Sequence, residues 1–378
     1  MRYKLGDICS FQSGGTPSKG NDSFYNGTIP WITTVALNGG FIDGDDAIEW
    51  ITETAIMKSA AKIVPANSIM IGTRVGVGKV AINKVEMSTS QDIISLLGID
   101  DSKWDKNFLC KFIQGKSNYL NSQARGATIK GIKIETIADL ELPNISITEQ
   151  KHISDVIDTI RLVLEKRTQE LSYLDNLVKA RFVEMFAHEK NMMPMSEICS
   201  IITDGTHQPP KFRNTGIPFI FVSNITGDKV TYDAEKFIDQ ETYDELIKRT
   251  PIEVGDVLLS TVGSYGHPAV VKSEKKFLFQ RHIAYLKPNK EMVDSDYLHG
   301  AILSPNAQRQ IEEGVKGIAQ KTLNLSEIKK IRIPVPTMEE QKAFAAFTVQ
   351  VDKSKIAVQT SLDETQLLFD SLMQHYFG

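Results

Sequence analysis

The sequence contains few cysteines and no long hydrophobic run. Its three cysteines, Cys9, Cys110 and Cys199, are an odd number without CxxC spacing, which argues against a disulfide framework and against a zinc site. No segment approaches the roughly 18 uncharged apolar residues of a membrane span, and the first residues lack the apolar stretch of a signal peptide. We therefore expect a cytoplasmic protein with reduced cysteines and no membrane partner.

An excess of positive charge is also missing. The 378 residues include 43 Lys and Arg against 47 Asp and Glu, a formal net charge of −4. Basic and acidic residues balance within 1–146 and within 191–336, so the acidic excess lies in 147–190 and 337–378. This charge distribution neither selects nor excludes a nucleic-acid partner. The length and the 41% hydrophobic content predict a globular chain with more than one domain.

The most informative feature is an internal repeat at a separation of about 190 residues. The segments that match in the same order are 5–9 and 195–199, the polar turns 14–17 and 204–207, 29–32 and 217–220, 126–130 and 317–321, 140–143 and 331–334, and 149–151 and 340–342. Several matches in one order indicate a duplicated unit rather than chance.

Each half is predicted to be a mixed domain of helices and strands. The runs 68–71 and 256–259 are strand-like, are followed by glycine-rich turns, and lead into 80–82 and 269–271, which is the pattern of a β-hairpin. Helical patterns follow near 105–122 and 295–313. We expect an α+β fold with two similar mixed α/β domains, 1–146 and 191–336, separated by the stretches 147–190 and 337–378.

Those two stretches are predicted to be long helices. From Ile153 to Met185, ten positions spaced alternately by four and three residues include eight apolar side chains, which is a heptad seam. Thr148 is a candidate N-cap, and a helix of about 40 residues would be roughly 60 Å long. The second seam is weaker: its apolar positions are Phe344, Phe347, Val351, Val358, Leu362, Leu368 and Leu372, with polar interruptions at Ser354 and Thr365. We expect an antiparallel coiled coil with a pseudo-two-fold relation between the halves; a helix packed on its own domain is the alternative.

The sequence contains partial matches to cofactor-binding and catalytic motifs, but the residues around them exclude those sites. Gly76 to Ala81 fits GxGxxA, but strand-like residues follow where a dinucleotide loop must open a helix, and Val80 excludes a Walker A motif. The segment Gln208-Pro209-Pro210-Lys211-Phe212 lacks the leading Asp or Asn of amino-methyltransferases. The histidines have no metal-binding spacing, and GxSxG is absent. A chain without its own catalytic activity, and with no metal or cofactor of its own, is the prediction.

Two globular halves, each leading through a Pro-x-x-x-x-x-Glu-Gln segment into a long helix, resemble the specificity subunit of type I restriction-modification systems. The resemblance rests on the turn Gly14 to Pro17, the Ile-Pro-aromatic strands, and the helix starts 143–150 and 334–341. It implies that each half is a target recognition domain reading one part of a bipartite site in double-stranded DNA, and that helix length sets the gap. It further implies two methyltransferase (modification) subunits that use S-adenosylmethionine, and restriction/translocase subunits that use ATP and magnesium.

Candidate DNA contacts are the polar residues of matching loops, whose side chains can bond phosphate or base edges. They are Thr16, Lys19 and Asn21 with Thr206, His207, Lys211 and Arg213; Arg74 and Lys79 with Ser264, Tyr265 and His267; Gln91 with Gln280 and Arg281; and Lys130 with Lys321. For the last pair we expect a sequence-independent phosphate contact. Each loop could also be an ordinary solvated turn.

Two other functions stay open at this point. The first is a protein-interaction scaffold on a coiled-coil strut, which would show no salt-dependent DNA affinity. The second is the recognition chain of a related enzyme in which one partner combines cleavage and methylation.

Overall fold

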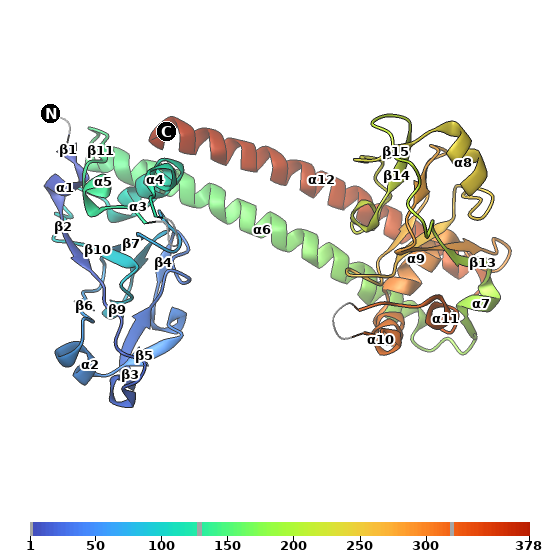
Figure 1. Ribbon diagram of the computed structural model, residues 1–378, viewed down its shortest axis with the longest axis horizontal. Helices are drawn as coiled ribbons and strands as arrows, with labels where there is room; N and C mark the ends of the chain where they lie inside the picture. The colour runs from blue at the N-terminus through green and yellow to red at the C-terminus, as the bar shows by residue number, and fades with distance from the viewer. Residues whose placement is uncertain (1–2, 127–130, 318–320) are drawn as a thin grey trace. The chain divides into compact units, whose positions relative to one another are not determined.

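The computed structural model describes residues 3–126, 131–317 and 321–378, which form two compact units (Figure 1). The first unit comprises 1–166 with 361–378, and the second comprises 167–360. Two helices of 40 residues each, α6 (Ile147–Phe186) and α12 (Met338–Phe377), contribute to both units. Each unit therefore contains the beginning of one long helix and the end of the other.

The first unit has mixed secondary structure. Its strands are β1 (Tyr3–Lys4), β2 (Ser10–Ser13), β3 (Tyr25–Ile32), β4 (Phe41–Ile42), β5 (Glu49–Ile51), β6 (Ile63–Val64), β7 (Ile69–Gly72), β8 (Val80–Asn83), β9 (Met87–Thr89), β10 (Ile93–Leu97) and β11 (Glu141–Leu142). Its short helices are α1 (Leu5–Ile8), α2 (Glu53–Lys58), α3 (Lys106–Gly115), α4 (Ser117–Gln123) and α5 (Ile134–Ala138). Helices α3 to α5 gather where α6 begins, whereas α2, β3 and β5 lie at the opposite end of this unit (Figure 1).

The second unit repeats most of this order. Its strands are β12 (Met192–Pro194), β13 (Cys199–Asp204), β14 (Ile217–Ile220), β15 (Phe237–Ile238), β16 (Val257–Ser260), β17 (Pro268–Val270), β18 (Leu278–Phe279), β19 (Ile283–Pro288) and β20 (Arg332–Pro334). Its short helices are α7 (Met195–Ile198), α8 (Gln240–Leu246), α9 (Ser295–Leu303), α10 (Pro305–Gly314) and α11 (Leu325–Ile328).

Sheet topology confirms the internal repeat. The order β2-β10-β7-β8 in the first unit corresponds to β13-β19-β16-β17 in the second, and the pair β1-β11 corresponds to β12-β20. In both units the Ile-Pro-aromatic strand pairs in parallel with a later strand, β3 with β9 and β14 with β18. The two expected hairpins are present as the antiparallel pairs β7-β8 and β16-β17. The chain is an α+β protein of two similar domains.

The ends of the long helices complete the two cores. Phe377, near the end of α12, is 1% exposed and packs its ring 5.4 Å from that of Phe108 in the first unit. In the second unit Phe186, at the end of α6, lies 5.2 Å from Tyr297 and 5.8 Å from Phe344. An aromatic residue at the last position of each helix thus belongs to the apolar core of a domain that the helix does not directly follow.

A buried glutamine fixes the start of each long helix. The side chain of Gln150 accepts from the Asp105 backbone N–H at 2.9 Å and donates to two backbone carbonyl oxygens, those of Lys103 and Ile145. Gln341 makes the same three bonds, with the Asp294 N–H at 2.9 Å and the carbonyls of Met292 and Pro336. The Glu-Gln repeat is therefore a structural clamp between the helix and the loop before α3 or α9.

The heptad seam of α6 is confirmed, because all ten of its positions are buried or partly buried. Two details of the helices differ from expectation. Ser146, not Thr148, caps α6, since its hydroxyl accepts from the Glu149 N–H at 3.2 Å. In α12 Leu368 is 51% exposed, and the partly buried Phe369 packs on the first core instead.

Candidate nucleic-acid interface

In the first domain the turn after β2 meets the turn between β9 and β10. The Gly14 N–H donates to Ile93 O and the Gly15 N–H donates to Thr89 O, both at 2.9 Å. A Cβ atom on Gly14 would lie 2.3 Å from Ser90 O, so only glycine allows this approach. The Thr16 hydroxyl consequently accepts from the Gln91 backbone N–H at 3.4 Å. Two predicted site residues from distant loops are thereby neighbours.

The hairpin turn of β7-β8 joins the same cluster. Arg74 extends a half-exposed side chain whose Nη1 lies 3.7 Å from the Asp92 carboxylate, next to Gln91 in the chain. The neighbouring Thr73 carbonyl accepts from the Ile132 N–H at 2.9 Å, which brings the segment after α4 to this place. Lys130 lies outside the described residues.

The remaining first-domain candidates are held by local contacts. The Asn21 side chain accepts from the Ser23 N–H at 3.2 Å and so caps a 3₁₀ turn. Lys19 donates to Glu49 at 3.2 Å, with 74% of its side chain exposed. Lys79 is exposed in the hairpin turn. Lys19 and Lys79 can reach a ligand, whereas the Asn21 side chain oxygen is already used.

The second domain builds an equivalent cluster. The Thr206 N–H donates to Phe279 O at 3.0 Å, and the Arg281 N–H donates to Thr206 O at 3.1 Å. A Cβ on Gly205 would lie 2.3 Å from Phe279 O, so this glycine repeats the close approach seen at Gly14. Gln280 forms a parallel bridge with Thr206. The matching loops of the repeat therefore meet in both domains.

The hairpin turn of β16-β17 joins this cluster and pairs with the segment that precedes α11. Val262 forms an antiparallel bridge with Thr322, and the Leu323 N–H donates to Thr261 O at 2.8 Å. Lys321, which precedes Thr322, is exposed beside the turn.

Three hairpin candidates have different surroundings. Ser264 is exposed and free to reach a ligand. Tyr265 is partly buried and packs against the apolar core of the domain. His267 donates its backbone N–H to Ser260 Oγ at 3.0 Å and lines a separate cavity bordered by α9 and by residues of α6 and α12.

Sequence reasoning missed Arg249. This residue follows α8, and its guanidinium donates to the Asp204 carboxylate at 2.5 Å, while His207 Nε2 lies 2.8 Å from the same carboxylate. Lys211 lines the same cavity as His207 and Arg249. The sequence feature that could have identified it is the basic dipeptide Lys248-Arg249, which directly precedes the helix-ending Thr-Pro pair. Arg213 is paired with Asp239 at 2.9 Å, and the Thr242 and Arg213 bonds keep the pKa of that carboxyl below its usual value.

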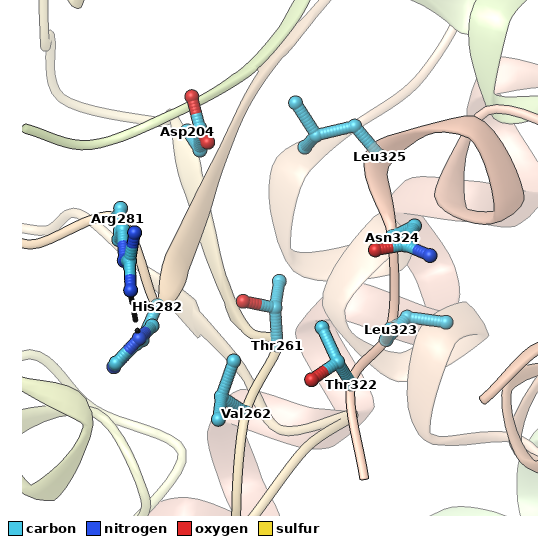
Figure 2. Close-up of a pocket in the computed structure, with 9 residues that line it drawn as sticks. All are labelled: Asp204, Thr261, Val262, Arg281, His282, Thr322, Leu323, Asn324 and Leu325. Carbon is cyan, nitrogen blue, oxygen red and sulfur yellow. Dashed lines mark hydrogen bonds between the residues drawn. The ribbon is translucent and has the colours of Figure 1, made fainter. Parts of the chain in front are cut away.

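A pocket of about 420 Å³ opens among these loops (Figure 2). Arg281 and His282 lie on one side of it, and Asn324 and Leu325 lie on the other, with Thr261 and Thr322 between them (Figure 2). Arg281 Nε donates to His282 Nε2 at 3.4 Å. Burial, and then the Arg281 charge, lower the pKa of His282, so this imidazole is neutral near pH 7. The pocket offers guanidinium, amide and hydroxyl groups suited to hydrogen-bonded recognition.

Two copies of one α+β domain, each followed by a 40-residue helix and each carrying a cluster of polar loops, define a class of chain that presents two binding surfaces. Residues 1–172 and 188–365 match the type I restriction modification DNA specificity domain. The chain belongs to this family, and its role is that of a DNA sequence-specificity subunit. Among the described residues, no helix is both long and apolar enough to cross a membrane.

The chain is similar in sequence to named specificity subunits and similar in fold to solved structures. The chain is 24% identical to the type I restriction enzyme EcoBI specificity subunit of Escherichia coli, over 85% of this chain and 69% of that protein. It is 22% identical to the MjaIX specificity subunit of Methanocaldococcus jannaschii, over 98% and 90%. The fold is similar to that of the S subunit from M. genitalium, with a TM-score of 0.55 and 14% identity over 100% of this chain and 96% of that chain. A chain from a study of type I complex assembly has a TM-score of 0.66 and 17% identity, over 100% and 97%.

Proposed function

We propose that each domain reads one half of an asymmetric bipartite DNA site with its loop cluster. The observation that carries this proposal is the turn before β10 and β19. In backbone register Arg281 of the second domain corresponds to Gln91 of the first, and His282 corresponds to Asp92. The carbonyls of Asp92 and His282 accept from the equivalent N–H groups of Thr73 and Thr261. The sequence-based match of Gln91 with Gln280 is therefore wrong by one residue. A glutamine amide pairs with N6 and N7 of adenine, whereas a guanidinium donates to O6 and N7 of guanine. Equivalent positions that carry an amide in one domain and a guanidinium in the other support two different half-sites.

The helices set the number of unread base pairs between the half-sites, and they dock two methyltransferase subunits. In this assignment the chain itself is non-catalytic and acts in the cytoplasm. S-adenosylmethionine belongs to the methyltransferase subunits, and ATP with magnesium belongs to restriction/translocase subunits. The neutral overall charge of the recognition domains supports this division, because a chain without a large basic surface depends on its partners for much of the phosphate contact.

The test is a genome-wide map of N6-methyladenine in the native host, with and without this gene. Loss of one asymmetric bipartite motif on deletion supports the proposal and gives both half-sites and the spacer. An unchanged map, with the methyltransferase subunits shown to be expressed, contradicts it and favours a protein-interaction scaffold.

A further inference from the structure

The arginines in the loops of the second domain differ in what neutralises them. Arg213 is paired with Asp239 and Arg249 is paired with Asp204. Within the part of the chain that the structure describes, Arg281 has no carboxylate at ion-pair distance, and its side chain bonds only to His282. Its positive charge is therefore available to a ligand, although it borders the pocket in Figure 2 together with Asp204.

The contact with His282 also determines which N–H groups of the Arg281 guanidinium remain available to a ligand. Arg281 Nε donates to His282 Nε2, which requires that this nitrogen carries no hydrogen. The two terminal nitrogens of the guanidinium remain unused among the described contacts. A guanine presents two acceptors, O6 and N7, on its major-groove edge, and the paired terminal N–H groups of arginine match them bidentately.

The backbone around Arg281 is fixed on both sides. The Arg281 N–H donates to Thr206 O at 3.1 Å, and the Ile283 N–H donates to Gln280 O at 3.1 Å across the turn. The His282 carbonyl accepts from the Thr261 N–H at 3.0 Å. Because the turn is tied to two other loops of the cluster, the backbone that carries Arg281 has little freedom left to lose on binding.

We propose that Arg281, oriented by His282, is the residue with which the second domain reads a guanine. Arg281 is the specificity-determining group, and His282 is a positioning residue that acts through it. This inference rests on the proposed function, since it needs the second domain to read its own half-site. The matching turn of the first domain carries Gln91 in place of Arg281, so the inference does not extend to the first half-site.

The experiment uses the full-length chain in complex with its methyltransferase subunits and a duplex carrying the mapped bipartite site. Arg281→Gln is expected to weaken discrimination between guanine and adenine at one position of one half-site by ~5- to 150-fold, the range for a lost bidentate pair. Replacing that guanine by 7-deazaguanine, which lacks N7, should weaken wild-type binding but have little effect on Arg281→Gln. Inosine, which keeps O6 and N7, should bind as guanine does.

The role of His282 needs separate variants. His282→Phe keeps a ring without the acceptor and should reduce discrimination at the same base as Arg281→Gln, with the salt dependence of binding unchanged. His282→Gln restores an acceptor and should recover part of that discrimination. Arg332→Gln is the matched control, because Arg332 is an exposed arginine of the same domain whose guanidinium bonds the Met192 carbonyl outside the loop cluster.

Three results would overturn the inference. In the first, Arg281→Gln weakens binding to all DNA sequences equally. In the second, no guanine of the second half-site loses discrimination in Arg281→Gln. In the third, His282→Phe discriminates between guanine and adenine as well as the wild-type chain does. Failure of the proposed function is a distinct outcome, because the wild-type complex would then bind no bipartite site at all.

Discussion

The glutamine clamp at the start of α12 allows a quantitative prediction. Gln341 is fully buried and makes three hydrogen bonds to backbone groups. In Gln341→Leu the Asp294 N–H and the Met292 and Pro336 carbonyls lose their partner. Each bond contributes about 1 kcal/mol, and each orphaned buried group costs about 1–3 kcal/mol. Three orphaned groups therefore destabilise the second unit by about 3–9 kcal/mol, a large part of the 5–15 kcal/mol that stabilises typical domains.

The repeat supplies a matched variant and a way to separate the units. Gln150→Leu should destabilise the first unit by a similar amount. All three tryptophans, Trp31, Trp50 and Trp104, lie in the first unit, so tryptophan fluorescence during urea unfolding reports on that unit. Hydrogen exchange measured on peptides of 192–335 reports on the second.

The control for helix propensity is Gln366→Leu, at an exposed position of α12 where the amide bonds only to Asp370. It should change stability by less than about 0.5 kcal/mol. A loss below 1 kcal/mol in Gln341→Leu, or an equal loss in Gln366→Leu, would refute the clamp.

Further predictions concern the core, the titrating groups and the DNA contacts. Phe377→Ala should destabilise the first unit by about 3–5 kcal/mol, the usual cost of removing a buried aromatic ring, as measured by tryptophan fluorescence. Burial raises the pKa of Asp256, so this carboxyl favours folding when it is protonated, and its contribution to stability is lost as the pH rises through the pKa of the folded state. Asp256→Asn should therefore make the free energy of unfolding less dependent on pH above about pH 4, as measured by urea midpoints at several pH values. Lys321→Ala should weaken binding to all sequences and reduce the salt slope by about 1, whereas Arg74→Ala should relax preference at one base; reversed results in a salt titration would remove both roles. Insertion of one heptad into each long helix adds about 10 Å and should lengthen the methylated motif's spacer by about three base pairs without altering either half-site.

The repeat made much of the architecture predictable from sequence. Matching segments predicted two domains of one fold, and the spacing of apolar residues predicted both long helices and the α6 seam. The α12 seam was predicted less well because Leu368 and Phe369 are adjacent and both apolar, so spacing alone does not decide which one faces the core. A similar ambiguity explains the helix start, where Ser146 and Thr148 are both good capping residues.

The loop cluster was predictable only in outline. Order in the chain identified which loops correspond, but their meeting depends on close backbone approaches at Gly14 and Gly205, which the sequence shows only as glycines in turns. Arg249 was missed because it has no counterpart in the repeat and reaches the cluster through Asp204, 45 residues earlier in the chain. Gln150 does have a counterpart in the repeat, Gln341, but its clamp role was not predicted, since a Glu-Gln pair at a helix start is usually exposed.

The division of the long helices between the units has a consequence for synthesis. The second unit is one continuous stretch, 167–360, and can close as soon as that stretch has left the ribosome. The first unit needs 361–378, so most of its chain is made early while the segment carrying Phe377 is made last. During translation the apolar site around Phe108 and Phe112 stays open, and we expect the domain that is synthesised first to be the one that finishes folding second.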